Sequence, residues 1–209
     1  MWDTGALRNP EGMVPAGPPF LGPESVAAIH HSLREAKRLG LELGLLTSSG
    51  WNAGGTWVTP EHAGKNVYAA EWTVKGPAVV REKLPFPEIP EHCPSDADGK
   101  PLYQREVALL AVPDAEDKHI TSMDQILDLS AHLRDGVLEW EAPPGTWRVL
   151  RFVCLNNGQE LIAPSPNSKG LLIDFLDPAA TEMHFQYILD KLGITPENAT
   201  EFGLVFLGA

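Results

Sequence analysis

The apolar residues between positions 23 and 39 recur at spacings of three and four, the period of a helix that is buried along one side. Pro23 suits the first turn of such a helix, and Gly40 is a stop signal directly after it. The pattern therefore predicts a helix over 23–39. Its buried stripe consists of Val26, Ile29, Leu33 and Ala36.

Three short apolar runs are typical of buried strands in an α/β fold. The first, residues 41–47, directly follows the helix, and the others lie at 171–175 and 202–207. A second helix is expected between the last two runs, with Asp177 as its cap, Pro178 in its first turn and Gly193 at its end. We expect these three strands to run parallel, as in βαβ units.

The middle of the chain has a different pattern, with alternating and β-branched runs separated by turn residues. The Pro-rich stretch 85–102 cannot be regular structure, and Ala-Pro-Pro-Gly at 142–145 predicts a hairpin turn. Several short strands at this spacing favour a β-sandwich. The predicted strands are 66–74, 78–84, 103–112, 137–141 and 146–155.

The order of these elements predicts an α/β fold with an all-β insert. We expect a partial (β/α)8-type barrel of about three strands and two helices, interrupted by a β-sandwich-like domain. The expected boundaries are 1–64 and 161–209 for the barrel part and 65–160 for the insert. Because a closed barrel needs eight such units, we expect the chain to be a piece of a longer protein.

The charge of the 209 residues excludes some partners. The formal net charge is −12, so a nucleic-acid backbone or an anionic membrane surface would be repelled on average. No apolar run is long enough to span a bilayer, and the N-terminus lacks the pattern of a signal peptide. Cys93 and Cys154 are too few for a disulfide framework; a single bridge and two free thiols both remain open.

The Gly-rich loop 48–59 carries the most informative chemistry, because it follows a predicted buried strand, where α/β sites form. Trp51 and Trp57 offer apolar faces that match the C–H faces of a pyranose, and Asn52 can both donate to and accept from hydroxyls. Its glycines allow close approach of the backbone to a ligand. The alternative is that both tryptophans pack in a core and the glycines only turn the chain.

Asp174 is the second candidate, since it ends the apolar run 171–173. Its carboxylate would lie at a barrel mouth, or it would cap the turn into the following helix. Glycosidases generally need two carboxylates, and no second one is marked out by its position. The catalytic residues and any metal ligands therefore stay unknown at this level, and neither a metal motif nor a Ser-centred triad is recognisable.

Four stretches resemble glycoside hydrolase family 106, the α-L-rhamnosidase-like enzymes. They are EAKRLGLELGLLTSSGWNAGGTWVTPE, YQREVALLAVP, LEWEAPPGTWRVLRF and APSPNSKGLLIDFLDPAATEMHF, in the order of the family. The resemblance implies the N-terminal part of a catalytic (α/β)8 barrel with a β-domain insert. It also implies inversion at the anomeric carbon and a calcium ion in the sugar site of the full-length parent, which is plausibly periplasmic or secreted.

By this resemblance, Trp51, Asn52 and Trp57 line the sugar site and Asp174 lies near it. Phe175 departs from the family, which usually has a lysine there, and the acidic stretch that commonly follows the third strand is not seen after position 207. We therefore expect a fragment that recognises a rhamnose-containing glycan but does not hydrolyse it. The alternatives are a non-catalytic carbohydrate-binding β-sandwich module and a fragment that binds no ligand.

Overall fold

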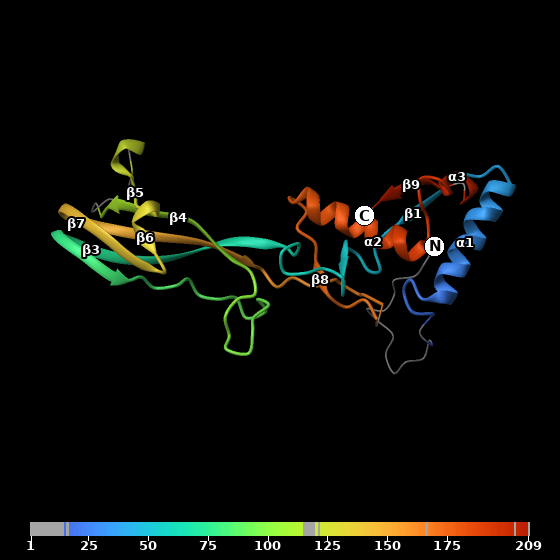
Figure 1. Ribbon diagram of the computed structural model, residues 1–209, viewed down its shortest axis with the longest axis horizontal. Coiled ribbons are helices and arrows are strands. Elements are labelled where there is room, and N and C mark those ends of the chain that lie inside the picture. Colours follow the sequence, from blue (N-terminus) through green and yellow to red (C-terminus); the bar gives the residue numbers. More distant parts are fainter. Residues whose placement is uncertain are drawn as a thin grey trace. The chain divides into compact units, whose positions relative to one another are not determined.

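A computed structural model describes residues 15, 17–114, 120, 122–165, 167–202 and 204–208. The chain forms two compact units (Figure 1): Met1–Gly64 together with Gly158–Ala209, and Lys65–Asn157. We call them the α/β unit and the β unit, and describe each by itself. Among the helices of the described residues, none has the length and apolar character needed to cross a membrane.

The helices of the α/β unit begin and end at local signals in the sequence. Helix α1 spans Pro23–Arg38, with its proline in the first turn. Helix α2 spans Pro178–Leu192; the Asp177 side chain accepts the N–H of Ala179, and Gly193 ends the helix in the left-handed conformation. A short helix, α3, covers Ala199–Phe202. The two predicted helices are therefore confirmed, with their caps.

The strands of the α/β unit form two small sheets. Strand β1 (Leu43–Leu46) pairs in parallel with β9 (Leu204–Gly208), as expected. Strand β8 (Leu171–Leu172) instead pairs antiparallel with β2 (Gly54–Gly55), so the expected third parallel strand is not found among the described residues. The reason is that the Gly-rich loop brings its own backbone against β8 and takes up that hydrogen-bonding edge.

Helix α2 contributes one buried stripe to the core of the α/β unit. Its buried positions recur every four residues, so they lie on one face of the helix. Ile188 and Leu192 pack with Leu33 of α1. The stripe also contains a polar residue, since its members are Ala180, His184, Ile188 and Leu192.

The β unit is a single antiparallel sheet in the order β3–β7–β4–β5, with β6 paired to β7. Two one-turn 3-10 helices, Met123–Gln125 and Ser130–His132, lie between its strands in the sequence. The prediction of two packed sheets is not confirmed, because the described residues of this unit form one sheet. Its strands are β3 (Lys65–Lys83), β4 (Gln104–Pro113), β5 (Leu127–Asp128), β6 (Leu133–Arg134) and β7 (Val137–Asn156).

The predicted hairpin at residues 142–145 is not formed, because the parts of β7 before and after this stretch both pair with β3 and not with each other. The register of β3 and β7 shifts between Gly76 and Ala78, where Ala142 and Gly145 lie opposite. Proline and glycine on both strands therefore interrupt the ladder at the same level. The residues that signalled a turn produce an irregularity in two long paired strands.

At this irregularity the β3–β7 ribbon bends back on itself, as Figure 1 shows at the tip of the β unit. Arg151 lies opposite Ala70 in the ladder, yet its guanidinium donates to the backbone oxygen of Leu84 at 3.3 Å. In a straight strand, Ala70 and Leu84 would be more than about 40 Å apart. The bent sheet encloses its own core, which includes Leu109, Leu138 and Val149.

Cys93 and Cys154 are both buried free thiols. Cys93 packs against Val153 and Leu155. Successive side chains of a strand point to opposite faces, so Cys154 points away from the face that Cys93 covers. This strand geometry explains why the two thiols are not bridged.

Candidate sugar-binding site

The Gly-rich loop follows β1, contains β2 and is hydrogen-bonded to a segment far away in the sequence. The buried hydroxyls of Ser49 and Ser168 are 2.6 Å apart. The N–H of Trp51 donates to the backbone oxygen of Ile162 at 3.1 Å, and that of Ser165 donates to Ser49 at 3.3 Å. The loop is therefore held by hydrogen bonds to the segment before β8.

The glycines of this loop allow close approach of protein backbone. A Cβ on Gly50 would fall 2.5 Å from the backbone oxygen of Ile162. A Cβ on Gly54 would collide with the backbone of Leu171 in the paired strand. The space at these two positions is filled by the chain itself, so the glycines serve packing of the loop, as in the alternative interpretation of the sequence.

Trp57 is a half-buried packing residue. Its ring stacks on Tyr187 with centroids 4.4 Å apart and lies 6.1 Å from Phe20. Its indole N–H donates to Nδ1 of His184 at 3.1 Å. Because neighbours occupy its ring and its N–H, Trp57 offers a ligand little free surface, which differs from the sugar-lining role expected from the sequence.

His184 was not singled out from the sequence, although it falls on the buried stripe of α2 between Ala180 and Ile188. The residue is 0% exposed. Its Nδ1 accepts from Trp57, so its proton lies on Nε2, which is 3.4 Å from the hydroxyl of Thr47. Burial lowers the pKa of His184, and a hydrogen bond with the Thr47 backbone acts in the opposite direction. The imidazole is thus held neutral between two ends of the loop.

Trp51 presents its ring to solvent, with 61% of the residue exposed. It is the only exposed tryptophan among the described residues. Asn52 is next to it and half-buried, and its backbone oxygen accepts from the hydroxyl of Ser48. An exposed indole beside an amide can stack on a sugar and bond its hydroxyls.

Asp174 lies close to this loop in the backbone pairing. The N–H of Ile173 donates to the backbone oxygen of Ala53 at 3.2 Å. Asp174 follows Ile173 and Asn52 precedes Ala53 in the sequence, so the two candidate residues lie on backbone segments that are hydrogen-bonded to each other. Its carboxylate accepts the N–H of Leu176 at 3.1 Å. The side chain therefore caps the local turn, which is the alternative that the sequence left open.

The described residues contain no group of three or more His, Cys, Asp or Glu side chains arranged to hold a metal ion. Calcium in proteins takes six to eight oxygen ligands, which include carboxylates, backbone and amide carbonyls and water.

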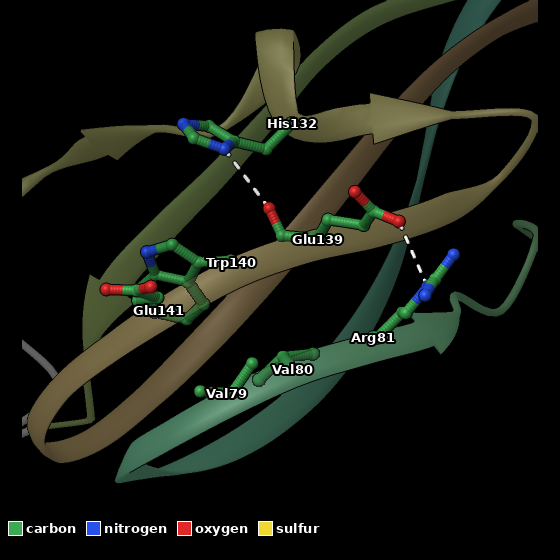
Figure 2. Close-up of a pocket in the computed structure, with 7 residues that line it drawn as sticks. All are labelled: Val79, Val80, Arg81, His132, Glu139, Trp140 and Glu141. Carbon is green, nitrogen blue, oxygen red and sulfur yellow. Dashed lines mark hydrogen bonds and ion pairs between the residues drawn. The ribbon is translucent and has the colours of Figure 1, made fainter.

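The β unit has an open pocket of about 620 Å³, lined by residues 79–81 of β3, residues 139–141 of β7 and His132 (Figure 2). Arg81 and Glu139 form an ion pair at 3.0 Å there, and Nδ1 of His132 donates to the backbone oxygen of Glu139 at 3.1 Å. The pocket's aromatic residue, Trp140, is only 8% exposed. This pocket therefore lacks an accessible ring on which a sugar can stack.

Sequence comparison finds a match over nearly the whole chain. The profile described as alpha-L-rhamnosidase, that of glycoside hydrolase family 106, matches residues 7–100 and 95–204. A protein of Formosa agariphila described as "Putative beta-glucuronidase" is 32% identical over 213 aligned positions, which cover 90% of this chain and 18% of that protein.

Structure comparison finds the same fold in a solved rhamnosidase from Novosphingobium sp. PP1Y. The match has a TM-score of 0.66 at 18% identity and covers 87% of this chain and 32% of the other. The chain thus spans less than two thirds of either relative.

Proposed function

The chain belongs to the alpha-L-rhamnosidase family, glycoside hydrolase family 106, and we propose that it forms part of the sugar site of an enzyme that hydrolyses terminal α-L-rhamnosides. The single observation that carries this proposal is the exposed ring of Trp51 on a loop that hydrogen bonds hold in place. An aromatic residue on an ordered loop loses less backbone freedom when a sugar binds than one on a loop that the ligand must first order.

The chemistry of rhamnose suits this surface. Its ring presents apolar C–H groups and a methyl group, which an indole face covers favourably, while its hydroxyls need donors and acceptors. Asn52 supplies both from the adjacent position. Trp57 supports the loop from the core instead of touching the ligand.

Hydrolysis needs two carboxylates on either side of the glycosidic bond. Asp174 is the candidate acidic residue that the backbone pairing places beside the loop, and its carboxylate is engaged with Leu176. We propose that β1 and β9 are adjacent strands of a (β/α)8 barrel and that the catalytic acids lie elsewhere in a longer protein. The chain by itself would then bind without turnover.

Calcium enters the proposal only through the family. If the longer enzyme holds this ion, Asp174 is the residue of this chain that the resemblance places near it, and further oxygen ligands would complete the coordination. A bound calcium ion would supply positive charge to orient sugar hydroxyls. No step of binding by Trp51 or Asn52 depends on it.

The second candidate is a carbohydrate-binding β unit, which the pocket beside Arg81 and Glu139 favours. The position of Trp140 weakens it, since this ring is almost wholly buried. The two candidates predict different binding surfaces: the loop of the α/β unit or the bent ribbon of the β unit.

Saturation-transfer NMR with L-rhamnose and with D-glucuronate separates these candidates. We expect transfer to L-rhamnose that is lost in Trp51→Ala and retained in Glu139→Gln. Transfer lost in Glu139→Gln alone would favour the β unit, and a preference for D-glucuronate would change the substrate class. Release of nitrophenol from a nitrophenyl α-L-rhamnoside by the purified chain would contradict the absence of turnover.

A further inference from the structure

Both ends of the Gly-rich loop are attached to one side chain of α2. Thr47 directly follows β1, and Trp57 comes two residues after β2. The imidazole of His184 touches the Thr47 hydroxyl at 3.4 Å and accepts the indole N–H of Trp57 at 3.1 Å. The segment that carries Trp51 lies between these two attachment points.

The surroundings of His184 keep the ring in one orientation. The residue is fully buried, and its centroid lies 5.7 Å from the ring of Trp57. Trp57 can only donate through its indole nitrogen, and Thr47 carries the hydroxyl on the other side. A single tautomer, protonated on Nε2, satisfies both contacts at once.

We propose that His184 is a positioning residue for sugar binding: mainly by accepting the indole N–H of Trp57, and to a lesser extent through its longer contact with Thr47, it fixes the loop that presents Trp51. The expected effect of His184 on rhamnose affinity rests on the proposed function. Its expected effect on the order of the loop rests on the contacts with Thr47 and Trp57 alone. His184 does not touch the sugar itself.

A matched pair of substitutions tests the contacts of the two ring nitrogens, Nδ1 and Nε2, one at a time. In His184→Asn, the amide oxygen takes the place of Nδ1 and can still accept from Trp57. In His184→Gln, the amide reaches the place of Nε2 and can bond Thr47 but leaves the Trp57 N–H without its acceptor. Both variants keep a polar amide in the same buried position.

Calorimetry with L-rhamnose and exchange of the Trp57 indole proton with deuterium are the two measurements. We expect His184→Asn to bind nearly as well as the unchanged protein and to keep slow exchange. His184→Gln should bind about tenfold more weakly and exchange about tenfold faster, as loss of one hydrogen bond implies. Ile188→Val, one turn further along the same buried stripe, should change neither.

If His184→Gln does not fold, Trp57→Phe removes the same hydrogen bond from the other side and retains a ring against Tyr187. It should weaken rhamnose binding to the same extent. Binding of L-rhamnose by His184→Gln or Trp57→Phe as tightly as by the unchanged protein would overturn the proposal.

If the unchanged protein binds no L-rhamnose, the proposed function fails, and the positioning claim is decided by NMR. The heteronuclear NOE of the Trp51 indole reports how well the loop is ordered. It should fall in His184→Gln and stay unchanged in His184→Asn and Ile188→Val. An unaltered NOE in His184→Gln would refute positioning independently of any ligand.

Discussion

Arg151 donates a hydrogen bond to the backbone oxygen of Leu84, at the far end of the strand against which Arg151 itself is paired. The same guanidinium bonds the backbone oxygen of Pro85 and both carboxylate oxygens of Glu106. One cation therefore connects the two arms of the bent ribbon. The bend in the β unit depends on this contact and on the apolar core that the ribbon encloses.

Replacement of Arg151 by Met should lower the free energy of unfolding by about 3 kcal/mol, because the buried backbone oxygen of Leu84 and the partly buried one of Pro85 lose their donor. Urea denaturation measures the loss. The matched control is Arg81→Met, which breaks an ion pair whose side chains are 79% and 59% exposed. It should cost at most about 0.5 kcal/mol. Equal losses in the two variants would show that Arg151 does not hold the bend.

Gly54→Ala tests whether the glycines serve the packing of the chain. A Cβ at this position collides with the backbone of Leu171, so β2 and β8 must separate. We expect a loss of about 1–3 kcal/mol in thermal unfolding. Gly17→Ala is the control, since nothing lies within 4 Å of its added carbon. Equal stability of the Gly54→Ala and Gly17→Ala variants would mean that the strands approach less closely.

The two loop tryptophans should respond differently to substitution. Trp57→Ala removes a ring packed on Tyr187 and should cost about 3 kcal/mol. Trp51→Ala removes a mostly exposed ring and should change stability by less than about 0.5 kcal/mol. Chemical denaturation of both variants compares them directly. The reverse order would exchange the roles assigned to the two residues.

Stability should depend on pH through His184. Burial lowers its pKa in the folded protein below the ordinary value near 6.5. As the pH falls, His184 is therefore protonated in the unfolded chain at a higher pH than in the folded protein. Its contribution to stability is complete above about pH 6.5 and falls by up to about 1.4 kcal/mol per pH unit below it, until the folded pKa is reached.

Urea midpoints between neutral and mildly acidic pH measure this slope. His184→Asn should flatten it, because the group whose pKa is lowered by burial is removed. A slope that persists in His184→Asn would assign the acid sensitivity to other groups.

Local signals made part of this fold predictable. Asp177, Pro178 and Gly193 define α2 by hydrogen bonding and backbone preference within a few residues, so no distant contact was needed. Residues 142–145 show the limit of such signals. The same Pro-Gly composition suits a hairpin turn and an irregular position in a long strand, and only the pairing with Gly76 decides between them.

The candidate site was predictable in chemistry more than in geometry. The sequence marks Trp51 and Trp57 equally, yet α2 covers one ring and leaves the other exposed. That difference depends on Tyr187 and His184, which are far from the loop in the sequence. His184 lies four residues from both Ala180 and Ile188, and this spacing could have predicted that it is buried. The spacing could not have predicted its hydrogen bonds with Thr47 and Trp57.

Calorimetric titration of the purified chain with L-rhamnose tests the central claim most directly, because it asks whether the loop of the α/β unit binds the sugar. The account predicts saturable binding that disappears in Trp51→Ala while that variant unfolds at the same urea concentration as the unchanged protein. Binding that is undiminished in Trp51→Ala, or no heat at any rhamnose concentration, would contradict it.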